Sequence, residues 1–144
     1  MNDFDIGYYA GFFDGEGSFD ISILRPTPNN RRKNTFYAYR GTLVNTYLPI
    51  IQEFQKHFGG SISKKKAHPN RKTCYAWVLN GKNLVNFINT IIPHLREKKE
   101  RAQIILDYAS TVSHARWSIT PEKRKFRDEL YARLKLLNKI GPKN

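Results

Sequence analysis

Cysteine is almost absent from this chain, and its histidines do not take over the role of metal ligands. The single cysteine, Cys74, excludes an internal disulfide and a cysteine-based zinc site, and it fits a reducing compartment. None of the four histidines is spaced as a metal-binding pair. A zinc site is therefore disfavoured.

Long hydrophobic runs are also missing. No apolar run approaches the roughly 18 residues that a membrane-spanning helix needs. The N-terminus, MNDFDIG, carries acids where a signal peptide has basic residues. We therefore expect no membrane partner, and the compartment stays open between an organelle (chloroplast or mitochondrion) and the cytoplasm of a bacterium or archaeon.

Acidic residues are few beside the basic ones. The 25 lysines and arginines face 12 aspartates and glutamates, which leaves a net charge of +13. This excess indicates a polyanionic partner, nucleic acid before a membrane surface. With 144 residues, 40% of them hydrophobic, the chain suits one domain over residues 1–144 with a sizeable core.

Hydrophobic periodicity predicts a regular series of helices and strands. The first helix covers about residues 6–15, and Gly15, in a left-handed conformation, and Gly17 are expected to end it. The pair Asn80-Gly81 is expected to close a later hairpin. The further predictions are strands at 18–25 and 35–45, a helix at 49–58, strands at 61–66 and 72–80, and helices at 82–92, 94–110 and about 121–139.

The first helix carries a stripe of small residues. Gly7, Ala10 and Gly11 share one face with Asp14. A glycine in a helix costs about 1 kcal/mol relative to alanine, and close approach of another backbone is the usual compensation. Because the stretch occurs once, the expected partner is the same helix of a second chain, and packing within one chain is the alternative.

Two acids stand at the end of this helix, where the macrodipole disfavours negative charge. Carboxylates and free backbone carbonyls are hard oxygen ligands that suit Mg²⁺ or Ca²⁺. In a basic protein, Asp14 and Glu16 could therefore hold a metal that serves phosphodiester hydrolysis. A solvated acidic turn is the alternative.

Residues 9–17, YAGFFDGEG, resemble the nine-residue motif of the LAGLIDADG homing endonucleases. Tyr9 replaces the first Leu, Gly15 an Ala and Glu16 the second Asp, so the apolar, small and acidic character is kept. The segments LVNTYLPIIQEFQKHFGGSI and CYAWVLNGKNLVNFINTIIPHLREKKERAQ resemble the elements that follow the motif in this family. The resemblance covers about residues 6–106, and the tail from Thr111 matches less clearly.

The resemblance implies an α+β fold, with an αββαββα core, an antiparallel DNA-binding sheet and an extra C-terminal helix. A single motif implies a homodimer whose motif helices pack through Gly7, Ala10, Gly11 and Asp14. The implied activity is a metal-dependent double-strand break with 3′ overhangs at a long, near-palindromic target. The expected cofactor is Mg²⁺, and Mn²⁺ or Ca²⁺ can substitute for binding.

The resemblance also implies site residues. Glu16 takes the position of the metal-ligating carboxylate, and Gly15 adds its backbone carbonyl. Asn45 matches a polar residue that holds an ordered water, and a simple turn former is the alternative. Lys98 matches a lysine beside the scissile phosphates, where it would stabilise transition-state charge. Helical spacing turns Lys98 inward with Leu95 and Ala102, whereas the adjacent Lys99 is the alternative.

DNA contacts are expected from the polar face of the sheet and from basic loops, since a two-stranded ribbon fits the major groove. The candidates are Asp20, Ser22, Arg31, Arg32, Lys33, Arg40, Thr42, Lys64, Lys66, Arg71, Lys72 and Tyr75. For Tyr75, packing in the core is the alternative.

Two other functions fit the same family resemblance. One is an RNA maturase that assists splicing, with its own intron RNA as partner. The other is a non-catalytic DNA-binding regulator on the same fold. The presence of Glu16 and Lys98 favours cleavage over both.

Overall fold

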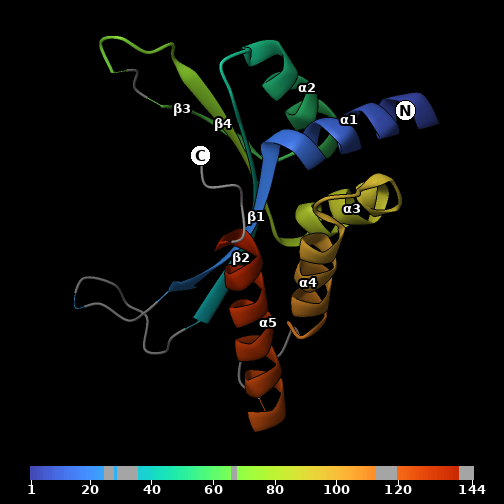
Figure 1. Ribbon diagram of the computed structural model, residues 1–144, viewed down its shortest axis with the longest axis vertical. Helices are drawn as coiled ribbons and strands as arrows, with labels where there is room; N and C mark the ends of the chain where they lie inside the picture. The colour runs from blue at the N-terminus through green and yellow to red at the C-terminus, as the bar shows by residue number, and fades with distance from the viewer. Residues whose placement is uncertain (25–27, 29–35, 66–67, 113–119, 140–144) are drawn as a thin grey trace.

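The computed structural model describes residues 1–24, 28, 36–65, 68–112 and 120–139, and its elements follow the predicted order (Figure 1). They are α1 (Asp3–Glu16), β1 (Gly17–Leu24), β2 (Phe36–Asn45), α2 (Leu48–Phe58), β3 (Ser61–Lys65), β4 (Cys74–Asn80), α3 (Gly81–Ile91), the 3-10 turn η1 (Ile92–His94), α4 (Lys99–Ser110) and α5 (Pro121–Lys139). The predicted α+β class is confirmed, with α5 as the extra C-terminal helix. None of the helices in these ranges combines the length and apolarity that spanning a bilayer requires.

The strands form one antiparallel sheet in the order β1-β2-β4-β3. Because side chains alternate along a strand, the register decides which residues share a face. Phe19 and Leu43 lie with Trp77 on the face against which the helices pack. Asp20 and Arg40 lie on the other face, which no helix among the described residues covers.

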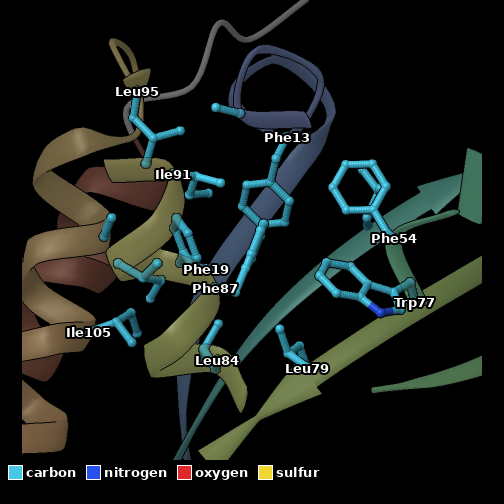
Figure 2. Packing of buried hydrophobic residues seen from close by; sticks show 14 of the residues in the cluster. Phe13, Phe19, Phe54, Trp77, Leu79, Leu84, Phe87, Ile91, Leu95 and Ile105 are labelled. Atoms are coloured by element: carbon cyan, nitrogen blue, oxygen red, sulfur yellow. The ribbon is translucent and has the colours of Figure 1, made fainter. Parts of the chain in front are cut away.

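Aromatic side chains dominate the core between the helices and the sheet (Figure 2). The ring of Phe13, from α1, has its centroid 4.9 Å from that of Phe19 and 5.2 Å from that of Phe87. Trp77 lies 5.2 Å from both Phe54 and Phe87. The inner side of α1 is therefore held by large, fully buried rings, and this fixes the position of its acidic end.

Helix α1 is longer at both ends than predicted. It begins at Asp3 because Asn2 and Asp5 form a reciprocal capping box. It ends at Glu16, and the prediction that Gly15 adopts a left-handed conformation is wrong, since Gly15 remains helical. Gly17 follows in extended conformation, and any Cβ there would lie 2.5 Å from the ring of Phe13. Glu16 is thus the last helical residue before β1.

Two other predicted boundaries are wrong. Asn80 ends β4 and Gly81 begins α3 with a φ of 59°, so this pair connects a strand to a helix and does not close a hairpin. The helix predicted from residue 94 begins only at Lys99. The residues between η1 and α4 form a non-helical turn (95–98), because they bind to the end of α1.

Candidate active site

The end of α1 and the turn at 95–98 meet through Asp14. Its carboxylate accepts hydrogen bonds from the backbone N–H groups of Arg96 (3.1 Å), Glu97 (3.1 Å) and Lys98 (2.8 Å). Burial raises the pKa of Asp14, but these three donors outweigh it and hold the pKa below its ordinary value. Asp14 therefore stays ionised and joins two segments that are more than eighty residues apart.

The side chain of Lys98 also binds Asp14. This side chain is 8% exposed, and its ammonium donates to the backbone carbonyl of Asp14. The predicted inward direction of Lys98 is therefore found, although its cause is this turn and not a helical face with Leu95 and Ala102. Lys99, the alternative, begins α4 and is exposed.

Glu16 lies two residues beyond Asp14 and is exposed. A helix leaves carbonyls of its last turn without partners inside the helix, and in chain order Gly15 lies between Asp14, whose carbonyl binds Lys98, and Glu16. This oxygen donor set fits Mg²⁺ or Ca²⁺ in kind. Across the described residues, no three side chains among His, Cys, Asp and Glu cluster closely enough to hold a metal.

A polar pocket opens beside this junction. Lys98 and Arg101 line it from one side, and Ser18 and Asp20 of β1 line it from the other. Asn138, near the end of α5, completes it. The pocket thus joins the strand that follows Glu16 to the turn that carries Lys98.

Asn45 does not join this group. It shares the helix-bearing face of the sheet with Leu43 and lies opposite Tyr75. Its side-chain oxygen accepts a hydrogen bond from the backbone N–H of Tyr47 at 2.8 Å. This hydrogen bond gives Asn45 the second of the two roles considered for it, in the turn into α2, and its role in holding a water stays a prediction.

The small residues of α1 divide between two faces. A Cβ added at Gly7, Gly11 or Gly15 would meet no atom within 4 Å, so packing within the chain does not explain these glycines. Ala10 is fully buried in its own core, and its prediction as a dimer-interface residue is wrong. The carboxylate of Asp14 is occupied within its own chain, and the interface role expected of Asp14 stays a prediction.

The uncovered face of the sheet is polar. Nε of Arg40 donates to both carboxylate oxygens of Asp20, at 2.8 and 3.1 Å, across the β1–β2 ladder. Ser22 and Thr42 share this face. Arg71 and Lys72 are exposed between β3 and β4. Other DNA-binding candidates lie outside the described residues, namely Arg31, Arg32, Lys33 and Lys66.

Lys64 and Tyr75 were expected on the polar face, and that prediction is wrong. They lie opposite each other on the helix-bearing face, and Tyr75 packs against the core. The alternation of β3 instead brings Lys65 to the polar face. Sequence reasoning missed Ser18, Ser61, Ser63 and Lys65, because only the strand register shows that they share this surface.

Comparisons with known proteins connect this chain to a family of endonucleases. The family model described as LAGLIDADG endonuclease matches residues 9–113, from within α1 to the residues just after α4. A search of curated protein sequences finds no significant match. Helix α5 lies outside the residues matched by the family model.

Solved structures of homing endonucleases share the fold. An archaeal intron-encoded homing endonuclease complexed with DNA, I-Vdi141I, is 21% identical, with a TM-score of 0.79 over 100% of this chain and 90% of that chain. I-CvuI, in complex with a DNA target, is 19% identical, with a TM-score of 0.78 over 98% and 85%.

A longer protein, I-SmaMI, bound to an uncleaved DNA target in the presence of calcium ions, also has a similar fold. It is 17% identical, with a TM-score of 0.71, and the match covers 94% of this chain but 45% of that chain. This protein therefore corresponds in length to about half of I-SmaMI. The family match and the shared fold confirm the resemblance seen in the sequence: the chain belongs to the LAGLIDADG endonuclease family, whose members are metal-dependent DNA endonucleases.

Proposed function

We propose that this protein acts as a homodimer that cuts both strands of a long, near-palindromic DNA site and leaves 3′ overhangs. The observation that carries the proposal is that Lys98 is buried and donates from its ammonium to the backbone carbonyl of Asp14, two residues before Glu16 in the chain. A buried lysine held at the helix end that carries an exposed carboxylate can act on a phosphodiester: the carboxylate would bind a metal, and the ammonium would stabilise negative charge on the phosphate.

The open face of α1 supports the homodimer. Gly7, Gly11 and Gly15 recur at intervals of four, so they lie along one side of the helix. Phe4 and Tyr8 flank this stripe and are 90% and 56% exposed. Two copies of α1 can approach closely across glycines, and the aromatics would then be buried between the chains. The match to about half of I-SmaMI is consistent with two copies forming one complete enzyme.

Glu16 and the carbonyl of Gly15 are the groups that would hold a divalent metal, Mg²⁺ in the first instance. When bound, the metal would activate water and stabilise the leaving oxygen. The ammonium of Lys98 contributes preorganised positive charge for the transition state, because Asp14 fixes the turn that carries it.

The polar face of the sheet is the proposed DNA-binding surface. Arg40 lies on this surface, and Asp20 binds its Nε. The two terminal nitrogens of the guanidinium would then face the edge of a base. Arginine reads guanine through such a pair of donors. The exposed Lys65, Arg71 and Lys72 are proposed phosphate contacts, which add affinity without sequence information.

The test is selection of cleaved sites from a randomised double-stranded DNA library. Wild-type protein in Mg²⁺ should yield one long, near-palindromic site, and in Ca²⁺ it should bind that site uncut. Glu16→Gln should bind but not cut, whereas Glu129→Gln, at an exposed carboxylate of α5, should cut normally. A wild-type protein that binds one site without ever cutting it would support the DNA-binding regulator, and binding to intron RNA alone would support the maturase.

A further inference from the structure

Helix α5 is connected to the proposed active site through two polar side chains, Asn138 of α5 and Arg101 of α4. Asn138, in the last turn of α5, donates from Nδ2 to the carbonyl of Phe19 at 3.0 Å. Its Oδ1 accepts from Nε of Arg101 at 3.1 Å. One amide therefore bridges the strand that follows Glu16 and the helix that follows Lys98.

Arg101 extends the bridge to the turn itself. Its Nη1 donates to the carbonyl of Glu97 at 3.3 Å, and its Nη2 donates to the carbonyl of Leu137 at 2.9 Å. The second bond satisfies one of the carbonyls that a helix leaves unpaired at its C-terminus. The guanidinium thus has three acceptors in three directions, and two of them belong to α5.

The turn is held from both sides as a result. The backbone N–H of Glu97 donates to Asp14, while its carbonyl accepts from Arg101. Lys98 follows directly in the chain. If the contact to Arg101 is lost, the turn keeps its hydrogen bonds to Asp14 but loses its link to Arg101, and the position of the ammonium of Lys98 becomes less well defined.

We infer that Arg101 and Asn138 are positioning residues for cleavage, which couple α5 to Lys98 and Glu16. This inference rests on the proposed function for its effect on the rate, and it does not require either side chain to touch DNA. It also assigns a role to a helix that lies outside the residues matched by the family model. A misplacement of about 1 Å at a reacting group can cost on the order of 100-fold in rate.

A matched control exists at the other end of the same helix. Arg127 donates to the hydroxyl and to the carbonyl of Thr111, each at 2.7 Å, and stacks on Tyr108. It anchors α5 to α4 as Arg101 does, but at the end remote from Lys98. Arg127→Ala should therefore lower the stability of the α4–α5 pair without changing the rate of cleavage.

The experiment compares Asn138→Ala, Arg101→Ala, Arg101→Lys and Arg127→Ala in the full-length protein. Single-turnover cleavage in Mg²⁺ should slow by about 10- to 100-fold for the first two variants, with DNA affinity in Ca²⁺ unchanged. Arg101→Lys keeps the charge but cannot span three acceptors, so it should also be slow. Arg127→Ala should cut at the wild-type rate.

Backbone hydrogen exchange gives a readout that does not depend on activity. The amides of Arg96, Glu97 and Lys98 should exchange faster in Asn138→Ala and Arg101→Ala than in wild type and Arg127→Ala. Unchanged exchange, or normal cleavage by Asn138→Ala while Lys98→Ala is inactive, would overturn the inference and leave the proposed function intact. Full activity of Arg101→Lys would overturn it too, because charge alone would then suffice. A wild-type protein that never cuts would remove the proposed function itself and, with it, the role in cleavage.

Discussion

Asp14 and Lys98 hold each other twice: the backbone N–H of Lys98 donates to the carboxylate of Asp14 at 2.8 Å, and the ammonium of Lys98 donates to the backbone carbonyl of Asp14. One contact fixes the turn, and the other fixes the side chain. The first acid of the motif therefore positions a lysine, and the second acid, Glu16, is the one that we propose would bind the metal.

Asp14→Asn should destabilise the protein and slow cleavage. The substitution leaves a single acceptor oxygen for three N–H donors, and an unsatisfied donor of this kind costs about 1–3 kcal/mol. Urea unfolding and single-turnover cleavage would measure the two effects. Asp107→Asn is the control, because the carboxylate of Asp107 accepts a side-chain hydrogen bond from Gln103 away from the turn. An Asp14→Asn protein as stable as wild type would contradict this role.

The same residue predicts a dependence on acid. The pKa of Asp14 in the folded state lies below its ordinary value of 3.8, so the stabilisation is complete above that value. It should be lost as the pH falls through the folded-state pKa. Unfolding free energy measured across the acidic range should therefore decline more steeply for wild type than for Asp14→Asn.

Substitutions of Gly11 should affect the folding of the single chain and the formation of the dimer differently. Gly11→Ala should stabilise the single chain by up to about 1 kcal/mol, because nothing in that chain lies within 4 Å of the new Cβ. Gly11→Leu should leave the chain folded but shift it toward monomer in sedimentation velocity, and it should lose cleavage. Gly17→Ala is the contrasting variant, since its methyl would meet the ring of Phe13 at 2.5 Å. A fully dimeric Gly11→Leu protein would exclude pairing through this stripe.

The Asp20–Arg40 pair should govern sequence preference more than stability. Both side chains are substantially exposed, at 39% and 51%, so breaking the pair should cost only about 0–1 kcal/mol of stability. Arg40→Ala should reduce discrimination at one base pair of each half-site by about 1–3 kcal/mol. Asp20→Asn should weaken the same preference, because Nε is no longer held. Cleavage of a panel of DNA targets, each changed at one base pair, measures this preference. If Arg40→Ala and Asp20→Asn both keep the wild-type preference, DNA does not bind at this pair.

The hydroxyl of Tyr37 should lose its proton at a higher pH than an ordinary tyrosine. Its hydroxyl donates to the carboxylate of Asp128, which, together with burial, raises the pKa of Tyr37 to about 12 from 10.0. The stabilisation is present below 10.0 and should be lost as the pH rises toward about 12. Ultraviolet titration of the phenolates should show one fewer late-titrating tyrosine in Tyr37→Phe. In Asp128→Asn, the titration of Tyr37 should move back toward 10.0, and no movement would show that burial alone sets it.

The local sequence pattern was sufficient to predict most helices and strands, but not the residues at which they begin and end. The alternation in SFDISIL and the 3.6-residue spacing of Leu84, Phe87, Ile88 and Ile91 predicted a strand and a helix that the structure contains. The end of α1 was misjudged because the need for glycine at position 17 comes from a ring packed against it, not from backbone conformation. The start of α4 was misjudged because Asp14, distant in sequence, captures the N–H groups of the preceding turn.

The sequence alone determined the class of the fold, the positive charge, and the motif whose acids and small residues indicated the family, because these depend on periodicity, composition and short spacing. Only the tertiary structure decided which motif residue serves which purpose. Ala10 entered the core and Gly11 stayed open because the core rings lie on one side of α1 only. Lys64 lies on the helix-bearing face and Lys65 on the polar face, because the pairing of β3 with β4 decides which residues of the strand share a face. Arg101 and Asn138 became partners because the consecutive helices α4 and α5 pack together, which joins residues 37 positions apart, a contact that no local spacing encodes.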